Sequence, residues 1–191
     1  MKRLLLILSA LLCTLVLRAQ EDILSSLEKA NGGRSFSALF TMTRRSSMLS
    51  GDLVTTGRIS VIPPTKLRWE TFTPSESVFI MDGDLVRLPD GSSRSASESG
   101  MPGRLPDLSA RLFDPALFDM SAERTGGGWK VSMRPKRRDL KRLFSEIYVY
   151  TSELYIMAIE LFNPSGDSTL IEFSGMEWDI KDDGRIFDAG R

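Results

Sequence analysis

The sequence predicts an α+β domain built on one large antiparallel sheet. Most of the chain alternates apolar and polar residues with a period of two, turn residues separate these segments at short intervals, and only two or three short segments have a helical pattern. We expect about nine to eleven strands. Because an open sheet of that width tends to curl, its inner face should be concave and mostly apolar, with few helices to fill it.

The first nineteen residues have the layout of a secretory signal peptide. A short positive segment (residues 1–3) precedes an apolar run of fourteen residues (4–17), which is too short for a membrane anchor. Cys13 lies inside this run, and this position disfavours a lipid-modified cysteine. We expect cleavage after Ala19, which would leave one exported domain of residues 20–191.

Composition excludes several classes of function. The chain has no histidine, so Ser-His and Cys-His nucleophiles and most zinc sites are excluded. Its single cysteine lies in the expected signal peptide, so no disulfide is expected after cleavage. Lys and Arg together number 25, as do Asp and Glu, and removing the three basic residues of the signal peptide leaves 22 against 25. This balance does not favour nucleic acid, and no cofactor or metal is predicted.

The first half of the exported chain predicts one helix followed by strands. Residues 22–30 have the pattern of a short helix, which Asp22 can cap and the following Asn-Gly-Gly can end. Pro63-Pro64 should interrupt pairing after the second strand, and Asp82-Gly83 is a strong hairpin signal. The expected strands cover residues 36–43, 53–62, 66–72, 77–81 and 84–88.

The second half begins with a polar segment, residues 89–106, that should form a long surface loop. Residues 107–120 are expected to be helical in two pieces, broken at Asp114-Pro115. Residues 136–142 form a basic turn or short helix, and residues 179–190 a final loop and edge strand. The strands expected between them cover residues 129–135, 144–151, 154–162 and 168–178.

Three motifs have simple structural interpretations. Asp179 and Lys181 belong to a segment that is weakly similar to a calcium loop, but a lysine at a ligand position would repel the ion. The basic segment 134–142 fits a solvated face, with docking to an acidic partner as the alternative. Asp82 and Asp84 fit turn formation better than a pair of catalytic carboxylates.

The apolar faces of the strands have two interpretations. Periodicity predicts which side chains turn away from water, but it does not show whether protein side chains or a ligand cover them. A filled core is the more common case. The side chains concerned are Phe36, Phe40, Ile59, Val61, Leu67 and Trp69.

From about residue 35 to residue 88 the sequence resembles the LolA family of periplasmic lipoprotein carriers. Three segments carry the similarity in the family's order: SFSALFTM (35–42), GRISVIPPTKLRWETFTP (57–74) and SVFIMDGDLVRL (77–88). The segment from residue 157 to residue 187 is similar to the closing hairpin and last strand of the family.

The resemblance implies a large curved antiparallel sheet that forms an incomplete, half-open β-barrel, with short helices as a lid over an apolar cavity. The cavity would shield the acyl chains of lipoproteins carried across the periplasm from the inner to the outer membrane, without enzymatic activity. The implied cavity residues are Phe36, Phe40, Ile59, Val61, Leu67 and Trp69, and the implied lid residues are Leu24, Leu27, Leu112, Phe113, Leu117 and Phe118.

The resemblance also implies partners. They are acylated lipoproteins, the inner-membrane Lol ABC transporter and, where one exists, an outer-membrane receptor; we expect a monomer. One position departs from the family, in which an arginine before the proline matched to Pro64 holds the lid shut by bonding to its backbone carbonyls. Here that position is Pro63, which has no donor. Arg58 or Arg68 could substitute, although the alternation puts both on the polar face.

Two other functions remain open at this point. On the same scaffold, the protein could be a module that senses lipids or misplaced lipoproteins in the cell envelope. An enzyme would have to use carboxylates, Lys or Tyr, for example the carboxylates Glu70 with Glu76 or Asp82.

Overall fold

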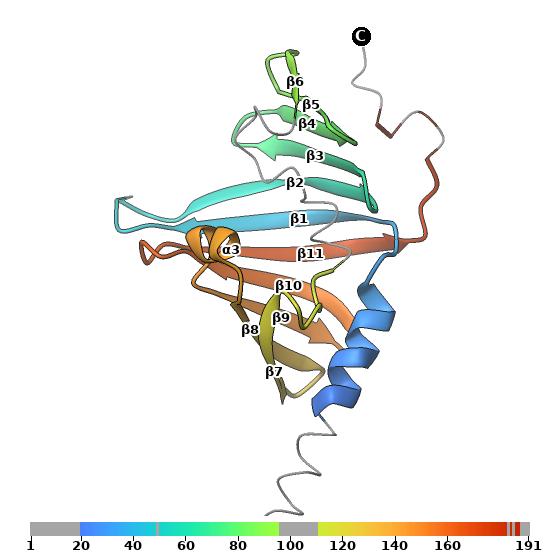
Figure 1. The fold of residues 1–191 in the computed structure, drawn as a ribbon. Helices are drawn as coiled ribbons and strands as arrows, with labels where there is room; N and C mark the ends of the chain where they lie inside the picture. The colour runs from blue at the N-terminus through green and yellow to red at the C-terminus, as the bar shows by residue number, and fades with distance from the viewer. Residues whose placement is uncertain (1–19, 49, 96–110, 183, 185, 188–191) are drawn as a thin grey trace, which may run out of the picture.

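The computed structural model describes residues 20–48, 50–95, 111–182, 184 and 186–187, so the predicted signal peptide lies outside the described residues. In this part of the chain, eleven strands pair in one antiparallel sheet, in the order β6-β5-β4-β3-β2-β1-β11-β10-β9-β8-β7 (Figure 1). The strands are β1 (Phe36–Arg45), β2 (Leu53–Ile62), β3 (Lys66–Thr73), β4 (Ser77–Asp82), β5 (Leu85–Arg87), β6 (Ser93–Ser95), β7 (Phe118–Arg124), β8 (Trp129–Pro135), β9 (Glu146–Ser152), β10 (Tyr155–Phe162) and β11 (Ser168–Trp178).

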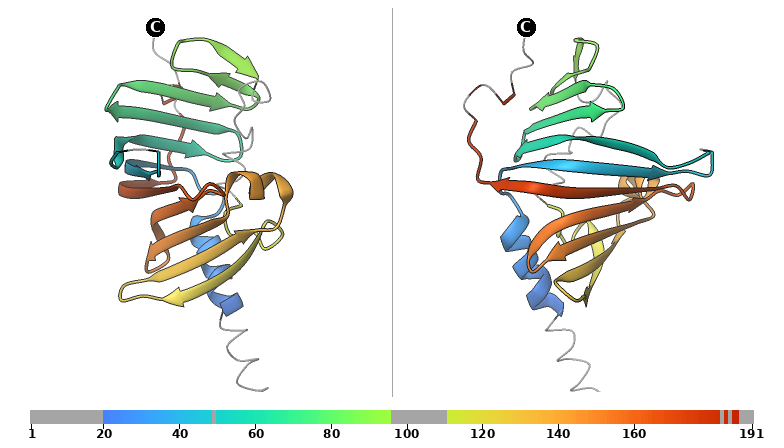
Figure 2. Two further views of the ribbon diagram at one scale, coloured as in Figure 1. Left: turned by 90° about the vertical axis from the view of Figure 1, so that its left-hand side faces the viewer. Right: turned by 180° about the vertical axis from the view of Figure 1, so that it is seen from behind.

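The sheet is strongly twisted and curved, and its edge strands β6 and β7 do not pair with each other (Figure 2). This arrangement confirms the predicted half-open β-barrel. Consecutive strands pair with each other except β6 and β7, which lie at the two edges, and β1 at the centre pairs with both β2 and β11. Pairs such as Phe40 with Phe173 therefore connect residues that are far apart in the chain.

The period-two patterns predicted most strands to within about two residues. The bounds of β2, β8 and β11 are those expected from the sequence. The hairpin at Asp82-Gly83 also forms, between β4 and β5. Gly83 has a φ of 60° there, a conformation that glycine adopts without steric cost.

Residues 20–31 form a helix that lies beside β9 and β10 in the views of Figures 1 and 2. The helix ends as predicted, because Gly33 has a φ of 68° and the Gly32 N–H donates to the Glu28 carbonyl at 2.6 Å. Its start differs from the prediction: Asp22 lies inside the helix and does not cap it. Within the described residues, no helix is both long and apolar enough to cross a bilayer.

Three other predictions were wrong for the described residues. Residues 111–117 form turns and residues 118–124 form strand β7, where two helical pieces had been expected. Pro115 lacks the N–H that would continue a helix, and the alternating Phe118, Met120 and Ala122 suit a strand that pairs with β8. The polar segment after β5 contributes the short edge strand β6, and the described residues after β11 form no strand.

Two hydrophobic clusters cover the inner face of the sheet. The first lies on β7–β10 and includes side chains from the N-terminal helix and the turns before β7. The second lies on β1–β5 and β11, and among its described members only Leu88 falls outside a strand. The helical layer of the α+β fold therefore packs on one half of the inner face.

Candidate functional site

The strand register brings the six predicted cavity residues together on β1, β2 and β3. Phe36 pairs with Val61, which pairs with Leu67 on the other side. Ile59 pairs with Trp69 in the same sheet, and the rings of Phe40 and Trp69 have centroids 4.3 Å apart. All six side chains belong to the second hydrophobic cluster.

Gly57 leaves the space that the Phe40 ring needs in order to contact the Trp69 ring. It pairs with Phe40 of β1, and the pairing of β2 with β3 has a register irregularity between Thr56 and Gly57. A Cβ at this position would lie 2.6 Å from Phe40 Cζ and would also collide with the Glu70 carbonyl oxygen. Only glycine leaves space for the Phe40 ring against the backbone of β2.

Sequence reasoning missed several residues of the same surface. Phe79 pairs with Trp69, Met81 pairs with Leu67, and Val86 pairs with Met81, so the apolar rows continue through β4 into β5. Phe173 extends the surface on the other side of Phe40. The period-two pattern of residues 77–81 carried this signal, but the strand register was needed to place it beside Trp69.

The second cluster is well shielded from water in this structure. Phe40 is 2% exposed, Leu67 is 5% exposed, and Trp69 is partly buried. A ligand would therefore reach these side chains only after a rearrangement of what covers them.

The predicted lid residues gather in the first cluster. Leu24 and Leu27 come from the N-terminal helix, and Leu112, Phe113 and Leu117 from the turns before β7. They pack with Val131, Met133, Ile147 and Val149 of β8 and β9. Phe118 belongs to the same cluster but is the first residue of β7, so its assignment to a helix was wrong. Whether these residues close a cavity stays a prediction.

Asn31 fastens the end of the N-terminal helix to the sheet. Its side chain is almost fully buried, and its Nδ2 donates to the carbonyls of Leu27 (2.8 Å) and Leu154 (2.7 Å). Its Oδ1 accepts the N–H of Ile156 at 3.2 Å. One amide thus satisfies a carbonyl of the helix and two backbone groups at the start of β10.

Among the described contacts, Arg34 is an arginine that bonds to the N-terminal helix; whether Arg58 or Arg68 replaces the missing lid arginine stays a prediction. Arg58 is exposed on β2, and Arg68 bonds to Glu70 and to the Ile186 carbonyl on the polar face of β3. Arg34 instead donates to the Ala30 carbonyl of the helix at 3.3 Å. It also pairs with Asp179 through two bonds of 3.1 and 2.6 Å, an interaction that lowers the pKa of the Asp179 carboxyl.

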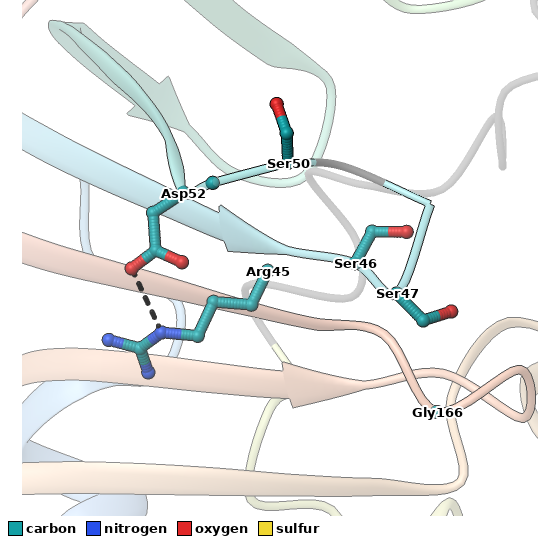
Figure 3. A pocket seen from close by; sticks show the side chains of 7 residues that line it. Arg45, Ser46, Ser47, Ser50, Asp52 and Gly166 are labelled. Carbon is teal, nitrogen blue, oxygen red and sulfur yellow. Dashed lines mark hydrogen bonds and ion pairs between the residues drawn. The ribbon is translucent and has the colours of Figure 1, made fainter.

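A polar pocket lies at the tip of the β1–β2 hairpin, beside the β10–β11 turn (Figure 3). Its volume is about 250 Å³. Arg45 pairs with Asp52 at 3.1 Å within it. The lining residues are Arg45, Ser46, Ser47, Ser50, Gly51, Asp52 and Gly166. Such a polar surface does not suit a hydrocarbon chain.

The opposite face of β8–β10 carries polar and aromatic side chains. Lys130 Nζ lies 3.9 Å from the centre of the Tyr148 ring and 5.9 Å from that of Tyr150. The Tyr150 hydroxyl donates to Glu160 at 3.0 Å, and the Tyr148 hydroxyl donates to Glu146 at 2.9 Å. These contacts account for the ordered polar face without a ligand.

Because of Tyr150, the free energy of unfolding should depend on pH above about pH 10. Burial, followed by the hydrogen bond to Glu160, raises the pKa of Tyr150 from 10.0 to about 12. Because the folded-state pKa lies above the unfolded one, this contribution is complete below pH 10 and is lost as the pH rises towards about 12. We expect the free energy of unfolding to fall by roughly 1–2 kcal/mol more in the wild type than in Tyr150→Phe across that interval. Urea unfolding at several pH values checks this, and parallel curves for the two proteins would contradict it.

Comparison with known proteins identifies the family of this chain. The family described as outer membrane lipoprotein carrier protein LolA matches residues 31–189. The chain belongs to the LolA family. A protein of Pseudomonas syringae named outer-membrane lipoprotein carrier protein is 27% identical over 149 residues, which cover 72% of this chain and 71% of that protein. A protein of the same name from Xylella fastidiosa is 30% identical over 130 residues, covering 63% and 60%.

Solved structures agree with this LolA fold. A LolA superfamily protein from Nitrosomonas europaea aligns with a TM-score of 0.50 at 11% identity, covering 88% of this chain and 97% of that one. A chain in the MucA/MucB complex of Pseudomonas aeruginosa aligns with a TM-score of 0.50 at 16% identity, covering 88% and 60%. At these identities the likeness concerns the fold alone.

Proposed function

We propose that this LolA-family protein is a non-enzymatic periplasmic carrier that shields the acyl chains of lipoproteins and moves them from the inner to the outer membrane. The acyl chains bind to the second hydrophobic cluster, on β1–β5 and β11. Acylated lipoproteins are its cargo, the inner-membrane Lol ABC transporter loads it, and an outer-membrane receptor, where one exists, unloads it.

One observation supports the choice of the second hydrophobic cluster as the acyl-binding site. The six predicted cavity residues form a continuous apolar surface with Phe79 and Met81, and the described residues that pack on it come almost entirely from the sheet. The helix and the turns before β7 pack on the other half. The half on β1–β5 is therefore the one that a guest can occupy without unpacking the helix from β8 and β9.

The energetics suit reversible carriage. Burying a hydrocarbon chain of about 16 carbons is worth up to roughly 12 kcal/mol, at about 0.8 kcal/mol per CH₂ group. The protein gives up part of this when its own side chains, such as Phe40 and Leu67, rearrange to admit the chain. The smaller net affinity lets the cargo leave again.

Trp69 provides a direct test of where the chain binds. In a variant that keeps only this tryptophan (Trp129→Phe, Trp178→Phe), a brominated fatty acid should quench the Trp69 fluorescence, because its bromine atoms would lie against the indole. The matched control keeps only Trp129, which lies in β8 with five strands between it and β3. Equal quenching in both proteins, or none in the first, would contradict the proposed site.

Trp69→Glu should abolish acyl binding without preventing folding. A carboxylate on the inner face would lie among acyl chains that cannot solvate it, so we expect affinity for a fluorescent fatty acid to fall at least about 100-fold. Phe72→Glu is the control, because Phe72 lies in the same strand and is 42% exposed. Circular dichroism with a thermal melt separates lost binding from unfolding. Unchanged binding by a folded Trp69→Glu would count against the proposal.

The carrying step needs its own experiment. Loaded protein is mixed with acceptor vesicles, and transfer of an acylated lipoprotein is followed by sedimentation. A carrier releases its cargo to the acceptor, whereas a sensor retains it and signals through a partner.

A further inference from the structure

The connection between β8 and β9 is the most basic part of the described chain. Residues 134–142 contain six Arg and Lys residues and one acidic residue, Asp139, in a protein that has 25 basic and 25 acidic residues in all. All six basic side chains are exposed. They form what we call the basic end, which consists of Arg134, Lys136, Arg137, Arg138, Lys141 and Arg142.

Half of these charges have partners. Arg134 pairs with Glu146, Lys136 with Asp119, and Arg137 with Asp139. Within the described part of the chain, Arg138, Lys141 and Arg142 make no ion pair. These three lie on the short helix α3 (Arg138–Leu143).

The fold of α3 does not require three unpaired cations. The helix is held by Leu140, which is buried in the first cluster, and by the Phe144 N–H, which donates to the Leu140 carbonyl at 2.8 Å. Lys141 and Arg142 lie in its last turn, where the helix dipole favours positive charge slightly, but Arg138 is its first residue, where the dipole disfavours it. Leu143 remains 40% exposed beside them.

A second exposed feature lies at the same end of the sheet. Residues Glu146, Phe162, Ser168 and Arg45 follow one another in register across β9, β10, β11 and β1, so the start of β9 and the β1–β2 turn lie at one end. The β1–β2 hairpin projects from this end (Figure 1). Met48 at its tip is 91% exposed.

We propose that the basic end and the neighbouring tip of the β1–β2 hairpin together dock onto an anionic lipid surface. Cations attract anionic headgroups, and single apolar side chains such as Leu143 and Met48 can insert between them. A stable interface with a protein partner would bury about 800 Å² of each surface around a closely packed, more apolar centre. Here the exposed apolar side chains stand on two separate projections, which favours lipid over an acidic protein.

Membrane docking rests on the proposed function only in its biological purpose, which would be to bring the carrier to a membrane. Its test needs no cargo. The chain from residue 20 onward is sedimented with phosphatidylcholine vesicles, with and without about one-third phosphatidylglycerol. We expect binding only to the anionic vesicles, with affinity that falls as salt is added.

The variant Arg138→Gln/Lys141→Gln/Arg142→Gln removes the three unpaired charges. Each basic side chain near an anionic surface strengthens binding by about fivefold, so the triple variant should bind on the order of 100-fold more weakly at low salt. The matched control is Arg58→Gln/Arg94→Gln/Lys181→Gln, which removes three exposed basic residues elsewhere. Met48→Asp should weaken binding further at higher salt, where the apolar contribution matters most.

The proposal would be overturned by no binding of the wild type to anionic vesicles, by equal loss in the control variant, or by a loss explained by a lower melting temperature. Binding of an acidic protein without binding to vesicles would also overturn it. Fatty-acid uptake in solution is measured in parallel. It should be unchanged in the triple variant, so a failure of docking and a failure of acyl binding remain distinguishable.

Discussion

Gly57→Ala should lower the free energy of unfolding by about 3 kcal/mol, because the added methyl group has no space on either side. The alanine Cβ would collide with the Glu70 carbonyl oxygen of β3 and lie 2.6 Å from Phe40 Cζ. A backbone oxygen cannot move without disturbing the pairing of β2 with β3, and the ring cannot move without losing its contact with Trp69. The variant should therefore also bind fatty acid more weakly.

Gly51→Ala is the matched control for this prediction. Gly51 lies in the β1–β2 turn, and an added Cβ there would meet no atom within 4 Å. We expect a change of less than about 0.5 kcal/mol. Urea unfolding of both variants measures the difference. A Gly57→Ala protein as stable as the Gly51→Ala protein would show that the close approach of β2 to β3 does not matter.

Asn31→Ala should cost a similar amount of stability and release the N-terminal helix. The substitution leaves the carbonyls of Leu27 and Leu154 and the N–H of Ile156 without their partner in a buried place. Unsatisfied buried polar groups cost about 1–3 kcal/mol each, with partial recovery when water enters, so we expect a total of about 3 kcal/mol. Hydrogen exchange should then show faster exchange throughout residues 20–31 than in β8 and β9.

Ser26→Ala provides the comparison on the same helix. Its hydroxyl bonds to the Asp22 carbonyl at 2.8 Å on the exposed side, so its loss should change stability by less than about 0.5 kcal/mol. If the two variants exchange equally, Asn31 does not anchor the helix. A loss confined to the helix, with an intact sheet, would show that the helix is a separable layer of the LolA fold.

Much of the fold follows from the local pattern, and the exceptions have physical causes. Strands such as β2 and β11 alternate apolar and polar residues, so a period of two identifies them without tertiary information. Residues 111–120 were assigned wrongly because Leu112, Phe113, Leu117 and Phe118 also fit a helical spacing. Pairing of β7 with β8 decided the conformation from Phe118 onward, whereas residues 111–117 form turns.

The candidate site was likewise predicted in part from the local sequence pattern and decided in part by the tertiary structure. Phe40 and Trp69 were predicted to face inward, but their stacking depends on Gly57, and nothing in the sequence alone marks this glycine as the space for a ring. Phe79 was within a predicted strand and was still missed, because its place beside Trp69 is set by the register of β3 and β4. The contact of Arg34 with Asp179 joins residues 145 positions apart and could not be predicted from spacing.

By itself, the sequence determined nine of the eleven strands, which of their faces are apolar, and which chemistries the absence of histidine excludes. These properties depend on neighbours within a few residues and on composition. The tertiary structure decided which half of the inner face the helix covers, which side chains meet across strands, and which cations stay unpaired on α3. Those outcomes depend on register and on contacts between distant segments, and such contacts form only when the whole sheet is assembled.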